Sequence, residues 1–111
     1  MIILFKNSKF QNECNNLKLL KQRQGDGRAK KIRQRLDELN AASNLEMMKN
    51  LPGRCHELKG DRNGQLSLDL DHPWRLIFVP ADDPPSQKGD GGIDWKNVRI
   101  IKILGIEDTH E

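Results

Sequence analysis

The chain has 111 residues, which is room for one domain, and we assign residues 1–111 to a single unit. Apolar residues make up 35% of it and charged residues 32%, which is enough for one modest core. Two cysteines are too few for a disulfide framework, and no segment has the pattern of a signal peptide or a membrane span. We therefore expect a protein of the reducing cytoplasm without a membrane partner.

The positive charge is concentrated in the first third of the chain. Residues 1–36 contain ten Lys and Arg against two acids, Glu13 and Asp26, for a net charge of +8, whereas residues 37–111 carry −5. Such an asymmetry indicates a surface for a polyanion. A solvated helix face explains the same charge equally well, so charge alone does not choose between the two.

The N-terminal half has the pattern of one strand followed by two helices. Residues Ile2–Phe5 predict a short strand. Apolar residues at helical spacing then predict a helix over 8–22 and, after a glycine-rich break, a second helix over 27–42. Asn44 is expected to cap a further short turn. The second helix carries a basic stripe on its outer face, formed by Arg28, Lys31 and Arg35.

The C-terminal half has the pattern of antiparallel strands, at 55–58, 65–70, 74–79 and 98–106. Asn63-Gly64 is the usual hairpin signal between the first two. Alternation over 65–70 predicts one buried and one solvated face, and the apolar run 74–79 predicts a central strand. Residues 80–96, rich in Pro, Gly and Asp, are expected to form a mobile loop.

These elements predict an α+β fold. It consists of a short N-terminal strand and two N-terminal helices packed on a twisted, mainly antiparallel sheet of about four to five strands. The face of the sheet that the helices leave open is the expected place for a functional site.

The sequence lacks the common motifs for metal and phosphate binding. The three histidines, His56, His72 and His110, are scattered without any paired ligand spacing, so we expect no metal and no cofactor. A glycine-rich phosphate loop and a nucleophile elbow are absent from the sequence too, which disfavours those enzyme classes.

Another set of residues has the composition that metal-free RNA cleavage requires. His56 and Lys59 lead into the predicted hairpin, Arg75 opens the next strand, and Asp108 and His110 close the chain. Ends of antiparallel strands can meet at one edge of a sheet, which would gather these groups. Cleavage by the 2′-OH needs a base for its proton, an acid for the leaving 5′ oxygen and fixed cations for the phosphate charge.

Several ordered segments resemble a known toxin family. Leu51-Pro52-Gly53, His56–Gln65, Trp74–Phe78 and Glu107–His110 look like the HigB branch of the RelE/ParE toxin superfamily. The resemblance covers about residues 51–80 and the C-terminus, and the helical half matches only in size and order. The ordered set with its spacing is more specific than any one of its pieces.

The resemblance implies a RelE/ParE-like fold and the toxin of a bacterial type II toxin–antitoxin system, of the plasmid-maintenance killer kind. Such a toxin is a ribosome-dependent endoribonuclease, an mRNA interferase, whose partners are the ribosome and its messenger RNA. A HigA-like helix-turn-helix antitoxin encoded beside it would hold it inactive, and the toxin would meet DNA only through that antitoxin.

The resemblance also implies a role for each matching residue. His110 would transfer a proton, and His56 would be its partner or position the substrate. Lys59 and Arg75 would hold the phosphate, and Asp108 would orient a histidine or contact RNA. Their positive charge, and not the resemblance, makes four further residues candidates for binding RNA phosphates: Arg28, Lys31, Arg35 and Arg62.

Departures from the family pattern keep other functions open. Thr109 stands where the family commonly has Tyr, which removes a stacking platform for a base, and Trp95 is a candidate replacement. Asp69 stands where relatives often carry a basic residue. One alternative is a ParE-like toxin that inhibits DNA gyrase and cuts nothing. The other is a degenerate toxin fold that binds antitoxin or RNA without catalysis.

Overall fold

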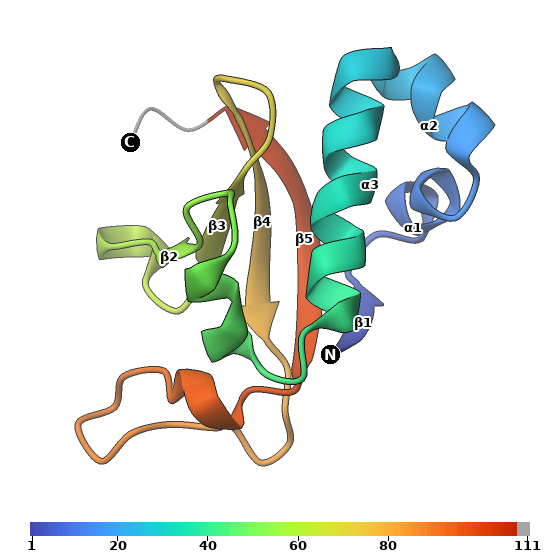
Figure 1. Cartoon of the computed structure of the whole chain (residues 1–111). Helices are drawn as coiled ribbons and strands as arrows, with labels where there is room; N and C mark the ends of the chain where they lie inside the picture. The colour runs from blue at the N-terminus through green and yellow to red at the C-terminus, as the bar shows by residue number, and fades with distance from the viewer. Residues whose placement is uncertain (109–111) are drawn as a thin grey trace.

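A computed structural model describes residues 1–108 as a five-stranded sheet with a helical layer on one side (Figure 1). The helices and strands, in chain order, are β1 (Ile2–Phe5), α1 (Ser8–Cys14), α2 (Leu17–Gln24), α3 (Asp26–Ala41), β2 (His56–Glu57), β3 (Leu66–Asp69), β4 (Trp74–Pro80) and β5 (Ile100–Asp108). Three 3₁₀ turns accompany them: η1 (Leu45–Asn50), η2 (Gly60–Arg62) and η3 (Trp95–Asn97).

The sheet confirms the predicted α+β class. Its strand order is β1-β5-β4-β3-β2, with β1 parallel to β5 and the other pairs antiparallel. Strand β4 lies in the middle, as its apolar run predicts. In the part of the chain that the structure describes, no helix has the length and apolar character needed to cross a bilayer.

Asparagine caps set the boundaries of the helical half. The Asn7 side chain accepts a hydrogen bond from the Phe10 amide at 3.0 Å, and Asn16 does the same for Leu19 at 3.2 Å. Because Asn16 starts a new helix, the single helix predicted over 8–22 is wrong, and α1 and α2 replace it. Asn44 caps η1 through the Met47 amide, which confirms that prediction.

The main core lies between α3 and the sheet. Helix α3 runs along one face of the sheet in Figure 1, and its buried stripe packs on apolar residues of the strands. The members of this core from α3, β3 and β4 are Ala29, Ile32, Leu36, Leu39, Leu66, Leu68, Leu76 and Phe78. Burial of this surface is the main force that fixes the helix on the sheet.

The face of β3 that points away from α3 departs from the prediction. Alternation does place Leu66 and Leu68 toward the helices, but Ser67 is 0% exposed instead of solvated. Its neighbour Ile77 on β4 is also buried, although it lies outside the helix-side core. The second face of the sheet is therefore partly covered, which a period-2 pattern alone does not reveal.

The loop between β4 and β5 folds back on itself. Gln87 and Ile93 form an isolated antiparallel bridge, and the Lys88 amide donates to the Gly92 carbonyl at 2.8 Å. The mobility expected for residues 80–96 remains a prediction.

We expect replacement of Leu39 by alanine to destabilise the domain by about 2–5 kcal/mol, because it removes a fully buried side chain and leaves a cavity. Urea unfolding measures this free energy. Leu17→Ala on α2 is the matched control, since Leu17 is 47% exposed and should change stability by less than about 0.5 kcal/mol. Equal effects of both substitutions would contradict the assigned core.

Candidate active site on the open face of the sheet

The strand register gathers polar residues on the face of the sheet opposite α3. Directly paired residues of antiparallel strands point to the same side, so they form rows across the sheet. The first row, from β2 to β5, is His56, Ser67, Ile77 and Gly105. The next row, from β3 to β5, is Asp69, Arg75 and Glu107. Two of the predicted catalytic residues, His56 and Arg75, thus lie in neighbouring rows.

Arg75 is held by a carboxylate at this face. Its Nε lies 2.8 Å from Oδ1 of Asp69, and its Nη1 donates to the Trp74 carbonyl at 3.1 Å. The Arg75 side chain is 7% exposed, against 29% for Asp69. Arg75, the residue predicted to hold a phosphate, therefore lies on this face, but it is already paired with Asp69.

Arg54 joins the same carboxylate, and sequence reasoning missed it. Its Nε lies 3.2 Å from Oδ2 of Asp69. The turn that positions it needs Gly53, whose φ is +110° and whose missing Cβ would lie 2.9 Å from Nε of Arg35. Arg54 itself has a φ of +51°. The Pro52-Gly53 turn was the available signal that the next side chain takes an unusual direction.

His56 is oriented by a backbone carbonyl. Its Nδ1 lies 2.7 Å from the carbonyl oxygen of Arg54. A carbonyl only accepts hydrogen bonds, so Nδ1 must carry the proton, and in the neutral ring Nε2 is then the basic nitrogen. One turn of chain therefore positions both the Arg54 guanidinium and the His56 imidazole.

Two other predicted catalytic residues lie in the β2–β3 connection and at the end of β5. Lys59 is exposed and precedes η2, in the connection between β2 and β3. Asp108 ends β5 and lies opposite Trp74 in the strand register. The acidic residue opposite Arg75 in that register is Glu107. His110, together with Thr109, lies outside the described residues.

The predicted RNA-binding arginines are engaged in contacts. Arg35 is buried, with Nε donating to the Asp69 carbonyl at 2.8 Å and Nη1 to Glu38 at 3.0 Å. Its predicted place on an outer basic face is therefore wrong, because α3 turns it toward β3. Arg28 pairs with Asp71 at 3.1 Å and lies 4.4 Å from the centre of the Trp74 ring.

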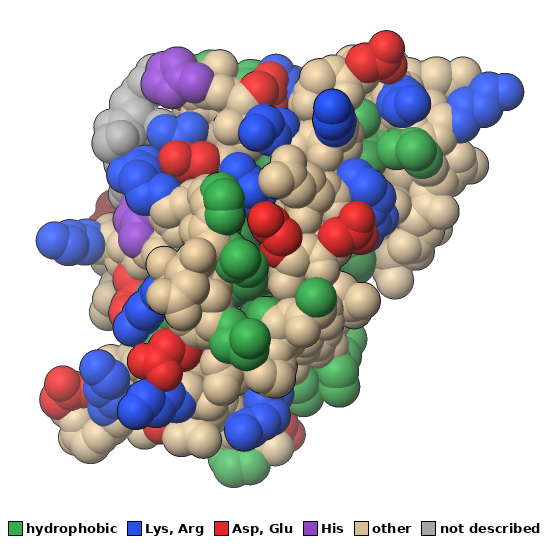
Figure 2. Space-filling model, in the orientation of Figure 1, with side chains coloured by type: hydrophobic (Ala, Val, Ile, Leu, Met, Phe, Trp, Pro, Cys, Tyr) green, Lys and Arg blue, Asp and Glu red, His purple; other side chains and the backbone are tan. Residues whose placement is uncertain are grey.

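Lys31 remains exposed, which is consistent with the predicted stripe. Figure 2 shows Lys and Arg side chains interleaved with Asp and Glu on the side of the molecule that carries β2, rather than a continuous basic surface. This side of the molecule therefore presents a mixture of both charges.

A hollow of about 280 Å³ adjoins the two rows. Arg62 pairs with Glu107 at its rim, and the Nε of Arg62 donates to Oε1 of Gln65 at 3.0 Å. The remaining lining residues are Lys6, Ile77, Leu104, Gly105 and Ile106. Polar and apolar residues thus both line this hollow.

Trp95 does not face this site. Its indole nitrogen donates to Oε2 of Glu57 at 2.9 Å, and the Lys49 ammonium lies 4.7 Å from its ring centre. The residue is 8% exposed, so Trp95 holds the β4–β5 loop against β2 and η1. Its proposed role as a stacking surface that replaces the missing tyrosine is therefore wrong.

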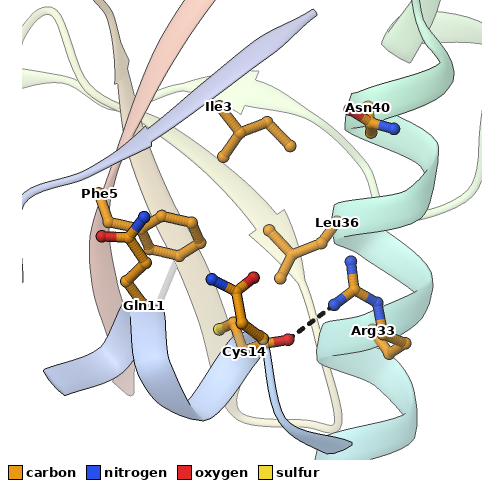
Figure 3. A pocket seen from close by; sticks show the side chains of 8 residues that line it. Ile3, Phe5, Gln11, Cys14, Arg33, Leu36 and Asn40 are labelled. Carbon is orange, nitrogen blue, oxygen red and sulfur yellow. Dashed lines mark hydrogen bonds between the residues drawn. The ribbon is translucent and has the colours of Figure 1, made fainter. Parts of the chain in front are cut away.

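A second hollow, of about 290 Å³, lies between β1, α1 and α3, away from the two rows (Figure 3). Cys14 lines it, and Arg33 on α3 donates to the Cys14 carbonyl at 2.8 Å. Burial raises the pKa of the Cys14 thiol to about 12, and that of Cys55 to about 12 as well. Neither thiol ionises near neutral pH, so neither has the character of a nucleophile. Among residues 1–108, no group of His, Cys, Asp and Glu is placed to hold a metal ion.

Comparison with known proteins finds a likeness in overall fold. No protein-family model matches the sequence, and no curated protein matches it either. Among solved structures, the chain is similar to the YoeB–YefM complex from Staphylococcus aureus, with 21% identity, a TM-score of 0.58 and coverage of 100% of this chain and 98% of the other. The YoeB dimer from Staphylococcus aureus has 22% identity and a TM-score of 0.57, with coverage of 100% of this chain and 98% of the other.

A YoeB/ParE toxin from Agrobacterium tumefaciens has a TM-score of 0.60 at 14% identity, with coverage of 99% of this chain and 100% of the other. Similarity at such low sequence identity shows a shared fold and does not show a shared reaction. The fold of the chain is similar to that of these YoeB and YoeB/ParE toxins.

Proposed function

We propose that the protein is the toxin of a type II toxin–antitoxin pair and acts as a HigB-like, ribosome-dependent endoribonuclease. The observation that carries the proposal is the clustering of His56, Arg54 and Arg75 on the open face of a toxin-type sheet. The HigB-like segments in the sequence support it. One structural neighbour, a YoeB, was solved in complex with YefM, which supports a protein partner.

The geometry supports cleavage by the 2′-OH without a metal. Nε2 of His56 would take the proton from the 2′ hydroxyl as its oxygen attacks phosphorus. The phosphorus–5′ oxygen bond then breaks, leaving a 2′,3′-cyclic phosphate, and an acid protonates the departing 5′ oxygen. The resemblance assigns that second proton transfer to His110. Arginine and Lys59 would neutralise the charge that builds on the phosphate.

The cellular setting follows from the same proposal. The ribosome would present the message, and exposed basic residues such as Lys31 would contact ribosomal RNA through phosphates. A HigA-like helix-turn-helix antitoxin in the cytoplasm would block the toxin and carry the only link to DNA. Asp108 would assist His110 or contact RNA.

The test is to add purified protein to a translating extract and map the ends of messages. We expect new 5′ ends in translated messages, and none in the same RNA when initiation is blocked. Cyclic phosphate at the matching 3′ ends is the expected chemistry. Cleavage that does not depend on translation, or no cleavage at all, would contradict the proposal.

A ParE-like function remains the second candidate, because one neighbour is described as a YoeB/ParE toxin and Asp69 neutralises the key arginine. Gyrase-dependent DNA damage on induction, with messages left intact, would favour it. Unimpaired growth on induction without any antitoxin would instead indicate a fold that retains binding and has lost catalysis.

A further inference from the structure

Two arginines from different parts of the chain converge on one carboxylate at the open face. The Asp69 side chain lies 2.8 Å from Nε of Arg75 on β4, and 3.2 Å from Nε of Arg54 in the turn before β2. Nη2 of Arg54 also approaches Oδ1, at 3.4 Å. The cluster carries two positive charges and one negative charge, so it keeps a net charge of +1.

The backbone of Asp69 is held by hydrogen bonds of its own. Its amide donates to the Gly53 carbonyl and its carbonyl accepts from Nε of Arg35, both at 2.8 Å. These bonds belong to the packing of β3 and do not involve the carboxylate. A side-chain rotation would therefore release both arginines without unfolding the strand.

The exposure of the three side chains shows where an outside anion could enter. Arg54 is 53% exposed and Asp69 29%, whereas Arg75 is almost closed to solvent. An anion from solvent thus meets Arg54 first and reaches Arg75 through the space that the Asp69 carboxylate fills. Guanidinium forks bind carboxylate and phosphate with the same planar geometry, so either anion fits the pair.

We propose that Arg54 and Arg75 form a binding site for an RNA phosphodiester and that Asp69 occupies it as a resident anion when RNA is absent. The inference rests on the proposed function, because it takes RNA as the ligand of this face. The carboxylate keeps the two arginines in place and weakens RNA binding, since the phosphate must displace it.

Replacement of Asp69 by asparagine tests the proposal, with a 2′-O-methyl RNA hexanucleotide of mixed sequence as a probe that cannot be cleaved. We expect D69N to bind the probe roughly 5-fold more tightly, which is about what one partly exposed ion pair is worth. The plot of log affinity against log salt should steepen by about 0.7, because the net charge of the site rises by one and neutralises one more phosphate charge of a single strand.

Asp37→Asn is the matched control. Asp37 also pairs with an arginine, Arg33 at 3.0 Å, but lies exposed on α3 away from the sheet. The D37N substitution changes the net charge by the same amount as D69N. Because Asp37 lies away from the proposed site, D37N should leave probe binding nearly unchanged. Equal tightening by D69N and D37N would show a general charge effect and would overturn the proposal. Weaker binding by D69N would also overturn it, because Asp69 would then only hold the arginines in place.

A second variant covers the case in which D69N folds poorly. Arg54→Gln changes an exposed side chain, and it should weaken probe binding in the otherwise unchanged protein and cancel the gain of D69N in the double variant. Unchanged binding by R54Q would overturn the proposal.

The message-cleavage assay separates this inference from the proposed function. If the unchanged protein cleaves messages but D69N and D37N bind the probe equally well, the proposed anion site is contradicted and the nuclease is not. If D69N binds the probe more tightly but the unchanged protein cleaves no message, the proposed nuclease function is contradicted and the anion site is not.

Discussion

Replacement of His56 by alanine is expected to lower message cleavage about 10²- to 10⁴-fold in the translating extract, the usual range for loss of a general base. The reason is geometric, because the Arg54 carbonyl holds the proton on Nδ1 and leaves Nε2 as the basic nitrogen. The quantity to measure is the initial rate at which new 5′ ends appear. Folding of the variant should remain close to normal, since His56 contributes little to the main core.

His72→Ala is the control for this substitution. His72 is exposed in the turn between β3 and β4, so its loss should leave the cleavage rate within about 2-fold. Removal of His110 is expected to produce a loss of the same order as removal of His56, since the resemblance makes it the second proton-transfer group. A full rate for His56→Ala, with His110→Ala inactive, would assign proton transfer to His110 alone.

Arg75→Gln is expected to reduce cleavage about 10²- to 10³-fold, the cost of removing one fixed donor from a developing oxyanion. Arg75→Lys should recover only part of the rate, because lysine keeps the charge but lacks the planar fork. Both variants are compared with Arg99→Gln, which removes an exposed positive charge just before β5.

Stability distinguishes the catalytic role of Arg75 from a structural one. Arg75 is buried and bonds to the Trp74 carbonyl, so Arg75→Gln also costs some free energy of unfolding. A rate loss that exceeds the fraction of unfolded protein by a factor of ten or more is the predicted result. Rates that follow the folded fraction in both Arg75 variants would show that the residue only supports the sheet.

Local sequence signals were sufficient for most of the secondary structure. The apolar run at Trp74–Pro80 and the turn at Asn63-Gly64 specify a central strand and a hairpin without reference to distant residues. The break between α1 and α2 was also encoded locally, by Asn16, but helical periodicity that continues across it concealed the cap.

The candidate site could be predicted only in part, because its contacts depend on register. His56 and Arg75 were found from residue type and order, and the sheet then set them in neighbouring rows. Arg35 had the pattern of an exposed helix position until packing turned it toward the Asp69 carbonyl. The Arg62–Glu107 pair joins the β2–β3 connection to β5, a proximity that only the completed sheet creates.

The most direct test of the account is a crystal structure of the protein with a 2′-O-methyl RNA fragment, because it locates the scissile phosphate. We predict a phosphate bound to Arg54 and Arg75, with Asp69 rotated away, Nε2 of His56 near the 2′ oxygen, and His110 on the side of the 5′ oxygen. RNA bound across α2 and α3, with Asp69 still paired to both arginines and the histidines remote from it, would contradict the account.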